Sequence, residues 1–167
     1  MKKNIILSVW AFLLVILESV ICRYIGIDGV YPSIVFTFVI CAAVCDDDIA
    51  RVTVLSLTCG LIADCLGGGA VGVNLFSFGI CAVLCNYITE KFFVPNIFVM
   101  FVSVILTSLL SRLIIFALGF AIFGNVSMEQ IFVPLILKYV IYNAGVSVII
   151  YALLKKTVYL KKTYDRR

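Results

Sequence analysis

The feature that most constrains this chain is a series of long apolar runs separated only by short polar turns. Several runs reach the roughly 17–25 apolar residues that an α-helix needs to cross a bilayer. Of the 167 residues, 64% are hydrophobic and 13% are charged, whereas a soluble domain is about 45–50% apolar and about 25% charged. A soluble fold of this size still needs a polar surface, so we expect the bilayer to be its solvent.

The runs predict an all-α, polytopic membrane protein with six helices in a single integral membrane domain. The first run lacks a small-residue cleavage site, so we expect it to remain as a span. The second and third runs are short for a full crossing, and they are expected to form a tight helical pair or to extend into the interface. The predicted spans are residues 5–22, 31–45, 52–66, 73–89, 97–123 and 131–154.

Basic residues predict the orientation, because cytoplasmic segments carry an excess of Lys and Arg. If the N-terminus is inside, the inner segments hold ten of the thirteen basic residues and the outer loops hold only Arg23. The remaining two, Arg112 and Lys138, lie within spans. An even number of spans then places both termini in the cytoplasm.

Four ionisable residues lie inside the predicted spans: Glu18, Asp64, Arg112 and Lys138. A charge near the middle of the bilayer costs a few kcal/mol, so such residues usually face the protein interior and pair. We therefore predict that the two acids neutralise the two bases across helices. The alternative is that Glu18 and Lys138 extend independently toward the interface, as long side chains can.

Metal and cofactor chemistry has little support in the composition. The chain has no histidine, which is the commonest metal ligand. Most of its seven cysteines lie inside apolar runs, where we interpret them as small buried hydrophobes. The sequence therefore predicts no cofactor and no metal.

Glycines cluster around Asp64. Gly60 lies one helical turn before Asp64, and the turn "GGGAVG" contains Gly68 and Gly72. Small residues let helices approach closely in lipid, and glycine lets the chain reverse direction tightly. This stretch is therefore expected to be either a close-packed hairpin or a binding element.

One alternative for this stretch is an enzyme, because it resembles part of the signature of CDP-alcohol phosphatidyltransferases. The residues on matching positions are Asp46, Ala50, Arg51, Gly60 and Asp64. That chemistry needs several aspartates to hold two divalent ions, but Ala43 and Gly68 stand where two of the four carboxylates belong. The predicted topology also places Asp46 and Asp64 on opposite sides of the membrane.

A second resemblance covers nearly the whole chain. The second span opens with "YPSIVF", the short polar turn "CDDDIAR" follows, and "GLIADCLGGGAVGVNLFSFG" then combines a Gly-x-x-x-Asp helix, a glycine-rich turn and Asn-Leu. In this order and spacing the sequence resembles the rod shape-determining MreD family. The residues that carry the match are Gly60, Asp64, Gly68, Gly72, Asn74 and Leu75, together with Pro32.

The resemblance implies a non-enzymatic membrane subunit of the bacterial cell-elongation complex, which directs peptidoglycan synthesis at the plasma membrane. The implied partners are an MreC-like bitopic protein and, indirectly, an MreB-like filament and peptidoglycan polymerases, with no nucleic acid. The implied fold is similar to the six-helix substrate-binding components of energy-coupling-factor transporters. The structural and interface candidates are Gly60, Asp64, Gly68, Gly72, Asn74, Arg112, Glu18 and Lys138.

That fold likeness leaves a vitamin-transporter subunit as an alternative function. Such components usually present an Ala-x-x-x-Ala face on the first helix for docking, and they bind their ligand with long outer loops. Here the first span reads "IILSVWAFLLVILESVIC", without such a face, and the predicted outer loops are short. Both departures favour the elongation complex.

Overall fold

In a computed structural model the chain is all-helical, as the sequence predicts. The structure describes residues 2–25, 31–67, 72–92, 96–123 and 133–156. This part of the chain contains six α-helices. They are α1 (Lys2–Ile25), α2 (Ile34–Cys45), α3 (Ile49–Gly67), α4 (Val73–Phe92), α5 (Ile97–Phe123) and α6 (Val133–Leu154).

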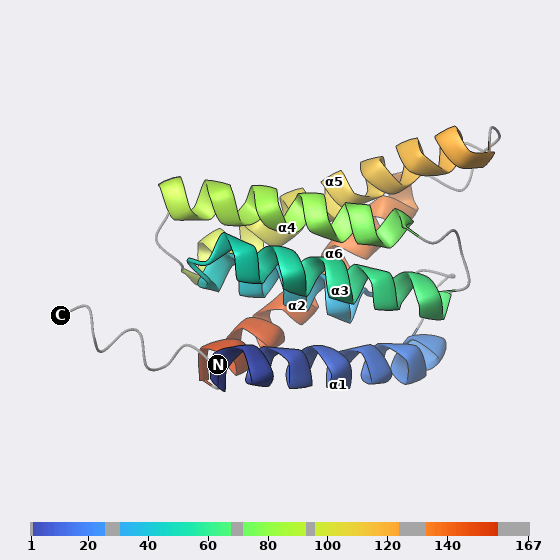
Figure 1. Cartoon of the computed structure of the whole chain (residues 1–167). Helices are drawn as coiled ribbons and strands as arrows, with labels where there is room; N and C mark the ends of the chain where they lie inside the picture. Colours follow the sequence, from blue (N-terminus) through green and yellow to red (C-terminus); the bar gives the residue numbers. More distant parts are fainter. Residues whose placement is uncertain (1, 26–30, 68–71, 93–95, 124–132, 157–167) are drawn as a thin grey trace.

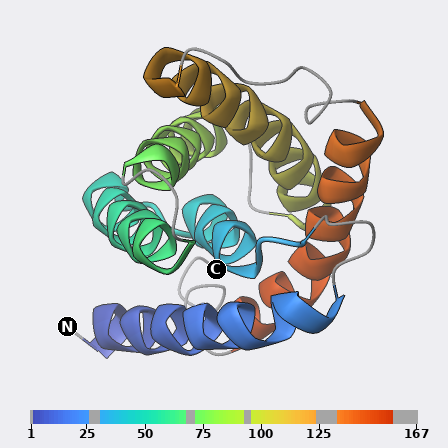
Figure 2. The same cartoon turned by 90° about the vertical axis from the view of Figure 1, so that its right-hand side faces the viewer.

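Helix α2 lies at the centre of the bundle, and the other five helices surround it (Figure 2). It contacts each of them, and every residue from Ile34 to Val44 is buried. Its sequence, "IVFTFVICAAVC", is apolar on every face, as expected for a helix that is buried all round. The core of the molecule is therefore built around this helix.

We call the two ends of the bundle proximal and distal, according to the helices that begin or end there. The proximal end is where α1 begins and α6 ends, and the α2–α3 turn lies there too (Figure 1). The distal end is where α1 and α3 end and where α2 and α4 begin (Figure 1). The start of α1 and the end of α6 thus lie at the same end of the bundle, as an even number of crossings predicts.

Four helices are long and apolar enough to cross a membrane, counted over the described residues. Their spans are Ile49–Leu66, Val73–Lys91, Ile97–Ala121 and Ile136–Leu154. The described apolar stretch of α1, Ile6–Val20, is shorter. Helix α2 has only 12 residues, which is about 18 Å against a hydrocarbon core of about 30 Å. It is therefore embedded in protein rather than in lipid.

The second and third predicted spans differ from the helices at their first residues. Helix α2 begins at Ile34 instead of residue 31, because Ser33 is its N-cap. Helix α3 begins at Ile49 instead of residue 52, because Asp48 accepts hydrogen bonds from the N–H groups of Ala50 and Arg51. With these extra residues α3 has an apolar stretch, Ile49–Leu66, that is long enough to cross a membrane, so the helix is longer than the predicted third span.

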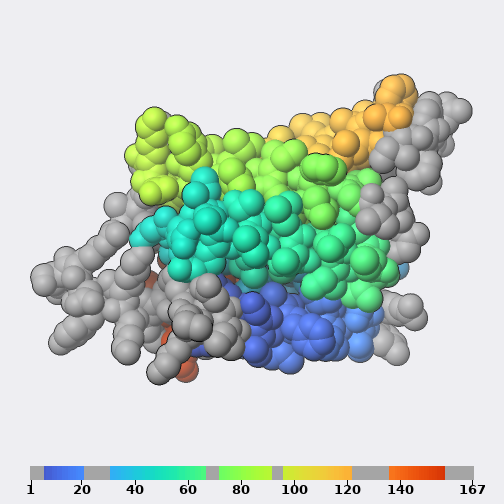
Figure 3. Space-filling model, in the orientation of Figure 1, coloured from blue at the N-terminus to red at the C-terminus, as the bar shows by residue number. Residues whose placement is uncertain are grey.

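The outward faces of the helices are apolar, as contact with lipid requires. Figure 3 shows one such face, formed by α1, α3 and α4. Large side chains exposed on these three helices include Phe12, Val54, Leu66 and Phe76. Large apolar side chains therefore lie both in the core of the bundle and on its outer surface.

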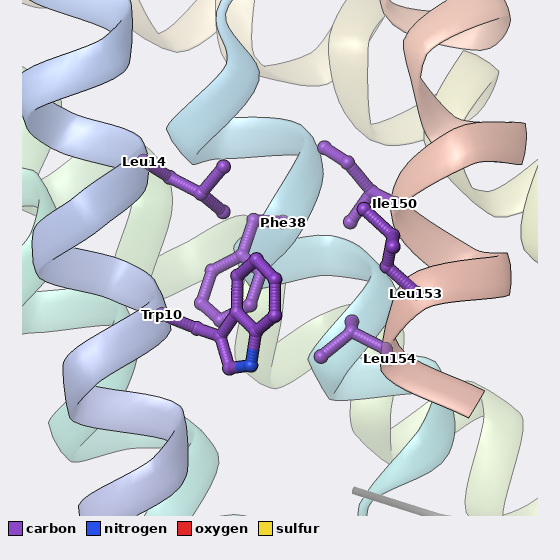
Figure 4. A pocket seen from close by; sticks show the side chains of 6 residues that line it. All are labelled: Trp10, Leu14, Phe38, Ile150, Leu153 and Leu154. Atoms are coloured by element: carbon purple, nitrogen blue, oxygen red, sulfur yellow. The ribbon is translucent and has the colours of Figure 1, made fainter. Parts of the chain in front are cut away.

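Trp10 of α1 fills space between helices. It lines a small apolar cavity between α1 and α6, with Phe38 of the central helix as its floor (Figure 4). The remaining lining residues are Leu14, Ile150, Leu153 and Leu154. Four cysteines on α2, α3 and α4 are free and buried, as the sequence indicates: Cys41, Cys59, Cys81 and Cys85.

Candidate functional site

Asp64, near the end of α3, caps the start of α4. Its carboxylate accepts hydrogen bonds from the backbone N–H groups of Gly72 (2.8 Å), Asn74 (2.9 Å) and Leu75 (3.0 Å). The first N–H groups of a helix have no partner within the helix, and its N-terminus carries partial positive charge. Asp64 is buried, so it satisfies these donors where water does not reach them readily.

Glycines bring the two helices close enough for this contact. A Cβ atom on Gly60 would lie 2.6 Å from the Cα of Leu75 and 2.8 Å from the carbonyl oxygen of Asn74. Only a residue without a side chain fits that space. Gly72 has φ of +108°, in the left-handed region that favours glycine. Gly68 lies outside the described residues.

Glu18 closes the start of α2 in the same way. Its carboxylate accepts a hydrogen bond from the N–H of Val35 (2.6 Å) and another from the hydroxyl of Ser33 (3.2 Å). Ser33 in turn accepts from the N–H of Phe36. At the distal end, therefore, a carboxylate from α1 caps the N-terminus of α2, just as a carboxylate from α3 caps the N-terminus of α4.

Two buried amides hold α2 from other sides. Asn143 of α6 accepts from the N–H of Ser33 (3.0 Å) and donates to the hydroxyl of Ser108 on α5 (3.2 Å). Asn86 of α4 donates to the carbonyl oxygens of Ala43 (2.9 Å) and Asp46 (2.6 Å). Side chains from α1, α4 and α6 thus satisfy backbone groups at both ends of the short central helix.

The acidic turn between α2 and α3 is internally paired. The guanidinium of Arg51 lies 2.9 Å from Asp46 and 3.1 Å from Asp48. Asp46 is buried, whereas Asp48 is exposed. These contacts stabilise the turn at the proximal end.

Arg112 does not meet the partner that charge balance predicts. Its guanidinium carbon lies 3.6 Å from the centre of the Tyr139 ring, and no ion pair among the described residues joins it to Asp64. The expected neutralisation of acids by bases therefore does not take the form of an Asp64–Arg112 pair, because backbone N–H groups at the start of α4 occupy the carboxylate. Lys138 is half-buried on α6, and its neutralisation by an acid stays a prediction.

Comparison with known protein families assigns the chain to one of them. A family model described as rod shape-determining protein MreD matches residues 1–157 of the chain. The chain belongs to the MreD family. No match was found among curated proteins or among solved structures. The assignment to this family of cell-shape membrane proteins therefore rests on the sequence match and not on similarity to a solved structure.

In this MreD-family chain, most of the residues on which the sequence resemblance was based lie together at the distal end of α3 and α4. Gly60, Asp64, Gly72, Asn74 and Leu75 all take part in the same close contact. Asn74 and Leu75 contribute backbone atoms to it. The resemblance in sequence therefore corresponds to one close contact, in which α3 packs against the start of α4 and caps it.

Several residues that make these polar contacts are harder to recognise from the sequence. Asn86 and Asn143 stand out as amides in apolar runs, but nothing in the sequence pairs them with the ends of α2. Ser33 directly follows Pro32, where a helix commonly starts, and its role as an N-cap was predictable. Ser108 and Tyr139 have no distinguishing pattern.

The enzyme alternative requires Asp46 and Asp64 to share a site. They lie at opposite ends of α3, and the helix between its start and Asp64 is roughly 22 Å long at about 1.5 Å per residue. The two carboxylates are therefore too far apart to hold the same pair of metal ions.

Proposed function

We propose that this chain is a non-enzymatic subunit of the bacterial cell-elongation complex, forming a single integral membrane domain in the plasma membrane. The observation that carries the proposal is the match of the MreD family over residues 1–157. The excess of basic residues in the predicted inner segments supports an orientation with both termini in the cytoplasm. The proximal end of the bundle is then cytoplasmic.

The polar contacts of the bundle support an architectural role for its carboxylates. Asp64 and Glu18 both bind backbone N–H groups at helix starts. A carboxylate engaged in this way stabilises the fold and is not positioned for proton transfer or metal binding. Helices in lipid associate through packing, small residues and buried polar contacts, so a rigid bundle can present a fixed surface to other membrane helices.

The partner we propose is an MreC-like bitopic protein, which would link the bundle indirectly to an MreB-like filament and to peptidoglycan polymerases. We also propose that the helices are arranged as in the substrate-binding components of energy-coupling-factor transporters. The central position of the short α2 is consistent with a compact six-helix unit. The engagement of Glu18 and Asp64 by helix ends favours assembly over vitamin binding.

Affinity purification from the native membrane tests this function. The tagged chain is expected to co-purify with an MreC-like protein, and its depletion is expected to round rod-shaped cells. A tagged, unrelated multi-pass protein serves as the control for nonspecific capture. Recovery of an ATP-binding cassette pair in place of the MreC-like protein, with normal cell shape on depletion, would contradict the proposal.

A further inference from the structure

Arg112 is a cation inside a membrane span for which the described part of the chain supplies no ion pair. It lies within α5, inside the span Ile97–Ala121. Its guanidinium makes no hydrogen bond or ion pair there, and its Nε atom is fully buried without an acceptor. An arginine in a membrane span usually pairs, because an isolated charge there is costly. The described residues therefore leave the guanidinium without an anion.

Tyr139 fixes the orientation of this cation. The guanidinium carbon is 3.6 Å from the ring centre, and Tyr139 is itself buried. The ring occupies one face of the planar group, and Nε is enclosed. The two terminal nitrogens are then left to bind a ligand, and a planar pair of N–H donors matches a phosphate bidentately.

The site lies close to the distal interface. Tyr139 is six residues after the start of α6, which is roughly 9 Å at about 1.5 Å per residue. Ser77, whose hydroxyl donates to the carbonyl of Ser111 beside Arg112 (3.5 Å), is four residues after the start of α4, or roughly 6 Å. The distal starts of α4 and α6 are therefore within one or two helical turns of the site, whereas Arg112 lies eleven residues, or roughly 16 Å, before the distal end of α5.

Exposed apolar side chains flank this position on α5 and α6. Helices α5 and α6 separate toward the distal end (Figure 2). Residues flanking Arg112 and Tyr139 on both helices are large, apolar and exposed: Leu109, Leu113, Leu137 and Ile141. Acyl chains that pack on these residues would bring a headgroup down to the guanidinium.

We propose that Arg112, seated on Tyr139, binds the phosphate of an anionic lipid from the distal leaflet. Phosphate is the anion that the lipids of the distal leaflet carry, and the apolar flanks accommodate the chains attached to it. A carboxylate from a partner helix would satisfy the same cation but would have to be buried itself. The lipid site does not depend on the proposed place of the chain in the elongation complex.

Native mass spectrometry of the purified full-length protein tests this site. The protein is titrated with phosphatidylglycerol and, separately, with phosphatidylcholine, whose phosphate is offset by its own ammonium. The wild-type protein is expected to retain phosphatidylglycerol preferentially. Arg112→Gln is expected to bind it roughly tenfold or more weakly, because charge-assisted hydrogen bonds are lost. Arg112→Lys, which keeps the charge without the planar fork, is expected to lie between them.

Lys91→Gln is the matched control, because it removes one exposed basic residue at the opposite end of the bundle. It is expected to leave phosphatidylglycerol binding unchanged. Photoactivatable phosphatidylglycerol on the wild-type protein covers the case in which Arg112→Gln does not fold. It is expected to label α5 and α6 beside Arg112 and Tyr139 more than photoactivatable phosphatidylcholine does.

Three results would overturn the proposal. The first is equal labelling by the two lipids, or full retention of phosphatidylglycerol by Arg112→Gln. The second is displacement of the lipid by an equal concentration of inorganic phosphate, which would reassign the site to a free anion. The third is a wild-type protein that holds no anionic lipid but loses a partner helix on Arg112→Gln, which would assign the cation to a partner carboxylate.

Discussion

At the scale of single residues, Asp64 shows how a membrane hairpin holds a carboxylate by means of backbone donors. Three N–H groups at the start of α4, one of them from Gly72 just before it, surround its two oxygens at 2.8–3.0 Å. Hydrogen bonds to a charged acceptor are stronger than neutral ones, and the helix N-terminus adds favourable electrostatics. The carboxylate therefore satisfies a helix end that lipid cannot satisfy.

Asp64→Asn is expected to destabilise the protein, because the amide keeps only one acceptor oxygen and no charge. The free energy of unfolding should fall by about 1–3 kcal/mol, and complex formation should weaken more than membrane insertion. Melting in detergent and recovery of the MreC-like partner measure the two effects. Glu90→Gln, the same chemical change at an exposed position on α4, should alter neither. Equal melting of Asp64→Asn and wild type would contradict the capping role.

Gly60→Ala is expected to separate α3 from α4. The added methyl would lie 2.6 Å from the Cα of Leu75, and backbone cannot move aside as a flexible side chain can. Overpacking of this kind typically costs about 1–3 kcal/mol, readable as a lower melting temperature. Gly145→Ala is the control, because nothing lies within 4 Å of its added Cβ. If both variants melt alike, the close approach is not a constraint on stability.

The sequence identified Asp64 as a site residue but not the groups that it binds. Its donors are eight to eleven residues further along the chain, and they reach it only because the turn and Gly60 bring α4 against α3. Charge counting instead suggested Arg112, which stacks on Tyr139. Ionic partners can be inferred from composition, whereas backbone donors depend on the path of the chain.

At the scale of helices, the informative element is α2, which is too short to cross the membrane and is held by its neighbours. Glu18 and Asn143 bind its start and Asn86 binds its end. In hydrocarbon, each unsatisfied backbone group costs several kcal/mol. These side chains therefore allow a short helix to begin and end inside the bundle.

Asn86→Ala is expected to leave the carbonyls of Ala43 and Asp46 without the donor that satisfies them. Each buried group that loses its partner costs about 1–3 kcal/mol, so the melting temperature should fall clearly. Thr58→Ala is the control, because Thr58 is exposed and its hydroxyl bonds only carbonyls of its own helix. A variant that melts as the wild type does would show that α2 does not depend on Asn86.

Hydrophobic runs predicted the number and order of the helices because lipid demands long apolar segments. The predicted fifth span, residues 97–123, has the same bounds as α5. The starts of α2 and α3 were less accurate, because Ser33 and Asp48 set them through local hydrogen bonds. The central position of α2 was not predictable, since a helix buried in protein and one in lipid have the same apolar composition.

At the scale of the whole molecule, five helices enclose one, and the start of α1 and the end of α6 share the proximal end (Figure 1). The charge bias predicts that this end faces the cytoplasm. A fluorescent protein fused to the C-terminus should therefore fluoresce, and alkaline phosphatase fused there should be inactive. The opposite pair of results would invert the orientation and place the Arg112 site in the inner leaflet.

The central claim is that the carboxylate of the glycine-rich hairpin closes a helix and binds neither a metal ion nor a substrate. A high-resolution cryo-electron microscopy map of the protein in lipid nanodiscs, in complex with its MreC-like partner, tests it most directly. The account predicts that both Asp64 oxygens contact the N–H groups of Gly72, Asn74 and Leu75. Density for a divalent cation or a small ligand against Asp64, or an Asp64–Arg112 ion pair, would contradict it.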